Sequence, residues 1–232
     1  MTDGLFAADD SRPFVTIDPP FQLNATGVAV FAPEVTGYYL LQCLKRRLGW
    51  ASFADKKLLD FGCGVRFART IYNLDIPFGL YFGVDVNLDV ILWLQANARD
   101  PRFTFAHLDT VNRCYNPKAG SADEGALEGL GVHACDAASM FSVITHQAPE
   151  EAQLTFRQLR RAIVDGGRLY FTAFIDHEID DYVEAAPHEP GTKSTYNPSF
   201  LVALVEKAGW RVDAIHAQKA TLQQPAFICT AI

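Results

Sequence analysis

The sequence of 232 residues has no apolar run that approaches the ~20 residues a helix needs to span a bilayer. Its five cysteines are scattered, odd in number and without a CxxC pair, which fits reduced thiols and gives no zinc pattern. No block of lysine and arginine offsets the net charge of -7. These absences argue against a membrane-spanning protein, a disulfide scaffold and a general binder of nucleic acid.

The first residues also lack the pattern of a secretory leader. Asp3, Asp9 and Asp10 stand there, and no basic segment leads into an apolar core. We therefore expect a cytoplasmic protein without a membrane partner. Residues 1–27 are rich in Pro, Asp and Gly, and we expect an N-terminal arm or lid over residues 1–33.

The remaining residues, 34–232, have the composition of a single globular domain, with 49% hydrophobic and 20% charged residues. Apolar spacing and capping residues predict helices over Glu34–Leu48, Arg66–Leu74, Asn87–Ala98, Pro149 to the residue before Gly166, and Pro198–Lys207. They predict strands over Lys57–Phe61, Leu80–Asp85, Arg102–His107, the Ala138–Thr145 half of Ala134–Thr145, Arg168–Ile175, Trp210–Ile215 and Phe227–Ile232.

This alternation predicts an α/β fold of the Rossmann-like kind. Strands that alternate with helices form a mostly parallel sheet, here of seven strands, with helices on both faces. No helix separates the last two strands, so the last strand should run antiparallel. Two polar, glycine-containing or acidic stretches, near residues 110–131 and 176–196, are expected as insertions.

The glycine loop after the first predicted strand is the strongest functional signal. Residues 58–69 read LLDFGCGVRFAR, and glycines at 62 and 64 let a ligand approach backbone amides and a helix N-terminus at the sheet edge. Asp85 ends the next strand, and an acid there can accept hydrogen bonds from ribose hydroxyls. Either feature alone also fits a tight turn or a helix cap. Together they favour a nucleoside-binding site.

The loop departs from the dinucleotide pattern GxGxxG/A, because Phe67 stands at the last position. Asp60 precedes the first glycine by two positions. A carboxylate there does not stabilise a pyrophosphate, whereas it attracts the ammonium group of an amino acid. These residues favour S-adenosyl-L-methionine as the cofactor.

An ordered set of motifs over about residues 56–232 resembles the class I S-adenosylmethionine-dependent methyltransferases. The motifs are LLDFGCG followed by RFAR, then YFGVDVN, RFTFAHLD, YNP, SVITH and DGGRLYFTAF. They are most similar to a subgroup whose members read LDFGCGxGRFAR and SVFTH. The resemblance implies a methyltransferase with a seven-stranded sheet whose last strand is antiparallel.

The resemblance also implies roles for single residues around the cofactor. Asp60, Gly62 and Gly64 would line its methionine part. The other implied contacts are Asp85 with the ribose hydroxyls, Val86 with the adenine, Asp109 with the adenine amino group, and Phe141 and Ser142 with the methionine and sulfonium.

The chain departs from this subgroup immediately after the second glycine of the loop. A glycine of the subgroup is either missing between Val65 and Arg66 or replaced by Arg66, depending on the alignment. Two interpretations remain open for this arginine. It pairs with the carboxylate of the cofactor, or it points into solvent from the first helical turn.

Two histidines follow predicted strands on the ligand side of the sheet, His146 after the fourth strand and His177 after the fifth. Either could serve as the general base for an acceptor hydroxyl, a role worth typically ~10²–10⁴-fold in rate. A structural hydrogen bond for His146 and an ordinary loop position for His177 are the alternatives. Four acids between residues 176 and 181 could ligate a metal, but acids in a loop are usually solvated, and we expect no metal.

The arm and the insertion after the fifth strand mix aromatic and acidic residues, which suits a small-molecule or glycan acceptor better than nucleic acid. We therefore expect methylation of a small or saccharide-like hydroxyl acceptor. One rival hypothesis is a catalytically degenerate methyltransferase fold that serves as a binding or regulatory protein. Another is a nicotinamide-dependent oxidoreductase. The oligomeric state is left open.

Overall fold

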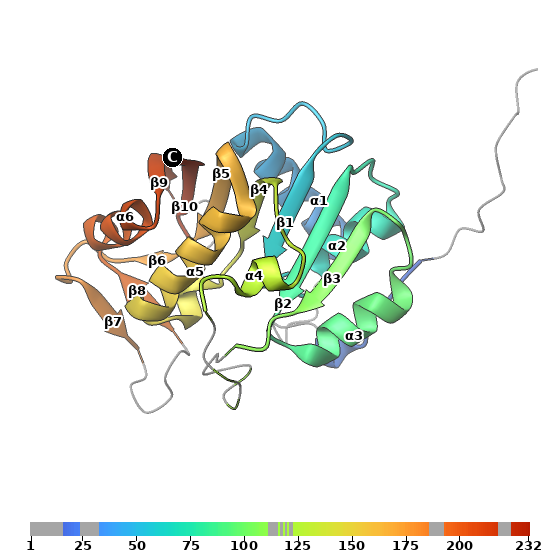
Figure 1. Ribbon diagram of the computed structural model, residues 1–232, viewed down its shortest axis with the longest axis horizontal. Helices are drawn as coiled ribbons and strands as arrows, with labels where there is room; N and C mark the ends of the chain where they lie inside the picture. Colours follow the sequence, from blue (N-terminus) through green and yellow to red (C-terminus); the bar gives the residue numbers. More distant parts are fainter. Residues whose placement is uncertain are drawn as a thin grey trace, which may run out of the picture.

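A seven-stranded sheet forms the centre of the computed structural model, which describes residues 16–23, 33–110, 116, 118, 120, 123–185, 193–217 and 224–232 (Figure 1). The strand order is β3-β2-β1-β4-β5-β10-β9. The strands are β1 Lys57–Phe61, β2 Leu80–Asp85, β3 Phe103–His107, β4 Cys135–Met140, β5 Ile163–Thr172, β9 Trp210–His216 and β10 Ala226–Ala231. Most of the predicted arm, parts of both predicted insertions and two residues of the YNP motif lie outside the described residues.

The strand directions confirm the predicted fold class. β1 pairs in parallel with β2 and β4, and the pairs β2–β3 and β4–β5 are parallel as well. β10 runs antiparallel to both of its neighbours, β5 and β9. The carboxyl ends of the parallel strands therefore share one edge, to which the arrowheads of β1 and β3 point in Figure 1.

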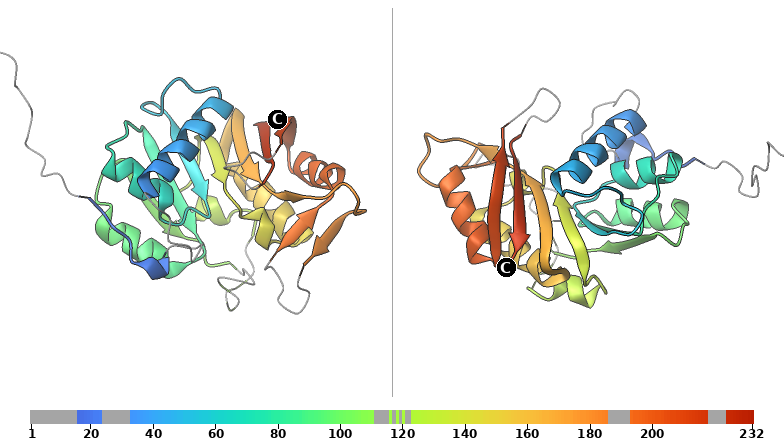
Figure 2. Two further views of the ribbon diagram at one scale, coloured as in Figure 1. Left: turned by 180° about the vertical axis from the view of Figure 1, so that it is seen from behind. Right: turned by 90° about the horizontal axis from the view of Figure 1, so that it is seen from above.

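Helices cover both faces of the sheet (Figure 2). On one face lie α1 Pro33–Arg47, α2 Arg66–Asn73 and α3 Leu88–Asn97, and on the other α4 Ala126–Gly129, α5 Pro149–Ala162 and α6 Pro198–Lys207. Successive strand residues alternate between the two cores, so that Leu58 packs with the first set of helices and Leu59 with the second. None of the helices in the described residues is both long and apolar enough to cross a membrane.

The fourth strand lies earlier in the sequence than expected. It spans Cys135–Met140, whereas the Ala138–Thr145 half was predicted. The extended chain ends at Ser142, which has a left-handed backbone with φ of 60° and donates its N–H to Thr172 Oγ1 at 2.9 Å. A 3-10 helix, η2, follows over Ile144–His146. The apolar residues after Met140 therefore pack from a turn and a helix rather than from a strand.

A second, three-stranded sheet occupies the region expected as a polar insertion. It has the order β6-β8-β7, with β6 Phe174–Ile175, β7 Tyr182–Glu184 and β8 Ser194–Tyr196. Tyr196 is fully buried and donates its hydroxyl hydrogen to the carbonyl of Gln147 at 2.6 Å. This bond fixes the small sheet beside η2. The predicted fifth strand is correspondingly divided, because its last two residues leave the main sheet and pair with β8.

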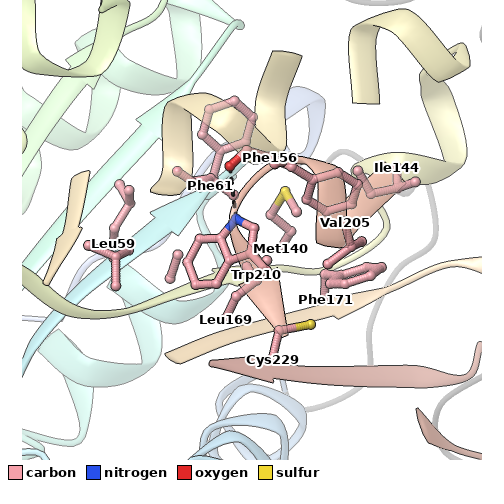
Figure 3. Packing of buried hydrophobic residues seen from close by; sticks show 14 of the residues in the cluster. Leu59, Phe61, Met140, Ile144, Phe156, Leu169, Phe171, Val205, Trp210 and Cys229 are labelled. Carbon is pink, nitrogen blue, oxygen red and sulfur yellow. Dashed lines mark hydrogen bonds between the residues drawn. The ribbon is translucent and has the colours of Figure 1, made fainter. Parts of the chain in front are cut away.

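Trp210 ties the end of the fold to the core on the α5 side (Figure 3). The side chain is fully buried, and its Nε1–H donates to the carbonyl of Phe156 at 2.9 Å. Met140, Val205 and Cys229 belong to the same apolar cluster. The edge strand β9 is thus held against α5 by a polar bond within an apolar environment.

Candidate active site

The glycine loop follows β1 and has a backbone that favours glycine at two positions. Gly62 and Gly64 have φ values of 72° and 47°. A Cβ on Gly62 would lie 2.5 Å from Cγ2 of Val143, whereas a Cβ on Gly64 would meet no atom within 4 Å. The N–H groups of Gly62 and Cys63 donate to the carbonyl of Val84 at 2.8 and 3.0 Å. The loop is thus fixed to β2, and the space beside Gly64 is open to a ligand.

Asp60 lies beneath this loop and is only 3% exposed. Its two carboxylate oxygens accept hydrogen bonds from the Tyr81 hydroxyl at 2.5 Å and from Ser139 Oγ at 2.7 Å. Burial raises the pKa of Asp60 to about 7, although both hydrogen bonds act in the opposite direction. The site therefore holds a poorly solvated carboxyl group, whose ionised form a nearby positive charge would stabilise.

Asp85 ends β2 and connects the loop to the next helix. Its Oδ2 accepts from the Gly64 N–H and its Oδ1 from the Asn87 N–H, both at 2.9 Å. Burial raises the pKa of Asp85, and the backbone hydrogen bonds partly oppose this shift. Each carboxylate oxygen has a second lone pair, so Asp85 can hold the loop and still accept a ligand hydroxyl.

Val86 and Asp109 lie on the two strand ends beyond the loop. The Val86 carbonyl accepts from His107 Nε2 at 3.1 Å, which positions the backbone after β2. Asp109 follows β3, and its Oδ1 accepts from the amide of Asn116 at 3.2 Å. Because β3, β2, β1 and β4 are adjacent in the sheet, Asp109, Asp85, the glycine loop and Ser142 follow one another along a single edge.

Phe141 and Ser142 complete this edge at the end of β4. The Phe141 ring packs edge-on against Phe67, with 5.2 Å between the centroids. Ser142 Oγ accepts from Gln224 Nε2 at 2.9 Å. The hydroxyl hydrogen of Ser142 can still be donated to a ligand, since its oxygen acts as acceptor in this bond.

Sequence reasoning missed the groups that support the site: Tyr81, Ser139, Thr172 and Gln224. Asp60 lies opposite Ser139 in the register of β1 and β4, so the pairing of these strands brings the two side chains together. A buried acid predicts a hydrogen-bond donor nearby. Which residue supplies the donor depends on the register of the strands. The two donors, Tyr81 and Ser139, are 21 and 79 residues away from Asp60 in the sequence.

The two candidate bases come from neighbouring segments of the fold. His146 ends η2, and His177 follows β6 of the small sheet. The hydrogen bond from Tyr196 to Gln147 connects that sheet to η2 directly after His146. In the acidic stretch, Asp176 accepts from the N–H of Glu178 at 2.8 Å. Among the described residues, no three His, Cys, Asp or Glu side chains are grouped to hold a metal ion.

Comparison with known proteins identifies the class to which this geometry belongs. A family model described as "Methyltransferase domain" matches residues 35–215. The chain belongs to this family. It is a methyltransferase, so the predicted enzyme class is confirmed. The predicted cofactor, S-adenosyl-L-methionine, is the one that a methyltransferase of similar fold holds. The finer subgroup, with its LDFGCGxGRFAR and SVFTH motifs, stays a prediction.

Solved structures with similar folds include three methyltransferases. An S-adenosylmethionine-dependent methyltransferase from Methanosarcina mazei is 16% identical with a TM-score of 0.51, over 77% of this chain and 93% of that one. Magnesium protoporphyrin IX methyltransferase from Synechocystis, with bound S-adenosylmethionine, is 11% identical with a TM-score of 0.57, over 91% and 89%. An O-methyltransferase family protein from Burkholderia thailandensis is 13% identical with a TM-score of 0.55, over 86% of this chain but 58% of that one. At these identities the likeness concerns the fold alone.

Proposed function

We propose that this methyltransferase transfers a methyl group from S-adenosyl-L-methionine to a hydroxyl oxygen of a small or saccharide-like acceptor. The observation that carries the proposal is the row of polar groups along one sheet edge, beside two segments that each bear a histidine. The negative net charge and the acidic stretch after β6 favour such an acceptor over nucleic acid.

In this proposal the cofactor lies along the carboxyl ends of β1–β4. Asp60 attracts the methionyl ammonium, the open space at Gly64 receives the methionine part, and Asp85 accepts from the ribose hydroxyls. The other contacts proposed from the motifs are Gly62 with the methionine part, Val86 and Asp109 with the adenine, and Phe141 and Ser142 beside the sulfonium. The open space beside Gly64 and the buried carboxyl group of Asp60 support this placement.

When bound, the cofactor would supply a methyl group on a positively charged sulfur, which would leave as a neutral thioether when an acceptor oxygen takes the methyl group. The protein contributes mainly position, because such a transfer depends on the alignment of the reacting atoms. His146 or His177 accepts the acceptor proton as the new bond forms. The small sheet covers the acceptor and excludes water.

The cofactor site is tested first, by calorimetric titration of S-adenosylhomocysteine into the wild type and Asp85→Ala. We expect micromolar binding, about 8 kcal/mol, which the variant loses because ribose contacts and the Gly64 bond disappear together. Absence of binding to the wild type would contradict the proposed site.

The reaction is tested with a panel of hydroxyl acceptors, including mono- and oligosaccharides, and by NMR of the methylated product. We expect His146→Asn or His177→Asn to lower kcat by about 10²–10⁴-fold, with unchanged binding of S-adenosylhomocysteine. A product methylated only on nitrogen or carbon would overturn the O-directed assignment. Cofactor binding without turnover of any acceptor would favour a binding or regulatory protein.

A further inference from the structure

Arg66 stands at the point in the loop where the chain departs from the pattern of the resemblance, with a glycine either missing before it or replaced by it. It is the first residue of α2, two positions after Gly64, and its side chain is half-buried rather than fully solvated. Its backbone carbonyl accepts from Thr70 Oγ1 at 2.8 Å, so the residue begins a regular helical turn. The side chain therefore starts from a fixed backbone position, two residues after Gly64.

The guanidinium of Arg66 has no hydrogen bond or ion pair with any residue that the structure describes. Arg69, one turn further along the same helix, differs in this respect. Its guanidinium bonds to Glu34 at 2.7 Å and to Asp18 at 3.0 Å. Partly buried arginines are normally paired in this way, because removal of a charge from water is costly without a counter-ion. Arg66 thus has unused capacity to bind an anion.

The buried carboxyl group of Asp60 is the charge that acts on Arg66. Burial lowers the pKa of the Arg66 guanidinium, whereas the negative charge of Asp60 raises it. Arg66 in turn acts to lower the pKa of Asp60. The two groups form no ion pair among the described residues, yet their charges act on each other, so a cation and an anion stand near each other at the loop. This arrangement complements an α-amino acid, because its ammonium can face the carboxyl group of Asp60 while its carboxylate faces the guanidinium of Arg66.

We infer that Arg66 binds the carboxylate of the methionyl part of the cofactor while Asp60 binds its ammonium. The inference rests on the cofactor placement proposed above. Arg66 is a binding residue that substitutes a side-chain contact for the close backbone approach a glycine allows. Of the two interpretations that the sequence left open, a half-buried guanidinium without a partner in the described part of the chain favours the carboxylate contact.

The test compares two ligands that differ only at the amino-acid end. S-adenosylhomocysteine carries the ammonium and carboxylate, whereas 5′-methylthioadenosine lacks both and keeps the adenosine and the thioether sulfur. Calorimetry of Arg66→Met should show S-adenosylhomocysteine binding weakened by about 10- to 100-fold, the range expected for a lost charge-assisted hydrogen bond. Binding of 5′-methylthioadenosine should stay unchanged. Arg66→Lys should recover part of the loss.

A matched control is Arg157→Met, at an arginine on α5 that pairs with Glu124 away from the loop. It should change neither affinity. Equal weakening of both ligands by Arg66→Met, or no weakening of either, would overturn the inference while the cofactor site stands. If the wild type binds neither ligand, the proposed cofactor site fails, and the inference fails with it.

Discussion

Asp60 is a residue of the candidate site whose charge changes near neutral pH. Its side chain is 3% exposed, and the hydroxyls of Tyr81 and Ser139 both donate to it. Burial outweighs these bonds and raises the pKa to about 7. In the ligand-free protein near neutral pH, the carboxyl group is therefore divided between its charged and neutral forms.

Cofactor affinity should consequently depend on pH. Only the ionised carboxyl group attracts the methionyl ammonium, and a raised pKa means that this form is lost as the pH falls through about 7. We expect the Kd for S-adenosylhomocysteine to rise about tenfold between about pH 8 and about pH 6. Calorimetry across this range measures the change, and Asp60→Asn should bind weakly at every pH.

Asp85 also has a raised pKa, and a ligand without the ammonium separates the two groups. In the proposed placement, 5′-methylthioadenosine would contact Asp85 through its ribose but would offer no charge to Asp60. Its Kd should stay nearly constant over the same range. A parallel rise for both ligands would instead assign the titration to the ribose site and contradict the role of Asp60.

At the scale of elements, α2 joins the glycine loop to the described part of the N-terminal segment. The helix begins with Arg66 at the loop and ends with Asn73, whose amide bonds the N–H and the carbonyl of Ile17 at 2.8 and 2.9 Å. On its other flank α2 packs closely on α1, since a Cβ on Gly37 would lie 1.9 Å from Thr70 Oγ1. Residues 16–23 are thus fastened to the helix that carries the loop.

Substitution of Asn73→Ala should release this segment. The N–H and the carbonyl of the buried Ile17 would both lose their hydrogen-bond partner. Each of these groups that water does not reach would lower the free energy of unfolding by about 1–3 kcal/mol. Hydrogen–deuterium exchange should show the Ile17 amide exchanging faster, and urea denaturation should show a lower free energy of unfolding. Asn97→Ala is the control, at an exposed asparagine whose side-chain amide donates to the carbonyl of Trp93 within α3. Equal exchange at Ile17 in both variants would show that Asn73 does not hold the segment.

The helix and strand bounds show which elements local patterns predict. β1, β2 and α6 have the bounds expected from the sequence, because each is an apolar run closed by turn or capping residues. Asn87 and Asn197 cap α3 and α6 through their side chains. The small sheet was missed, since β7 and β8 have only three residues each and depend on the anchor at Tyr196.

At the scale of the whole molecule, two apolar cores share one sheet, so the packing on one face of the sheet affects the packing on the other. The strands contribute alternate residues to both cores, and β9 and β10 close the sheet far from the glycine loop. Trp210 holds this far edge through its bond to α5. Its removal therefore tests how much the closing strands contribute to stability.

Trp210→Phe should lower the free energy of unfolding by about 1–3 kcal/mol, because the buried carbonyl of Phe156 loses its side-chain donor and the smaller ring leaves a gap. Urea denaturation measures the change. Trp93→Phe is the comparison, at a partly buried tryptophan whose ring nitrogen has no partner among the described residues. A similar loss in both variants would show that the indole hydrogen bond is not the cause.

By itself the sequence determined the alternation of strands and helices, the antiparallel last strand, the position of the glycine loop and the enzyme class. Each of these depends on periodicity, caps or short motifs that neighbouring residues carry. Only the tertiary structure decided where β4 ends, that a second sheet follows β5, and which hydroxyls bind Asp60. It also decided that Arg66 is half-buried and unpaired among the described residues rather than solvated. These features depend on strand register and burial, because the groups that meet in space are far apart in the chain.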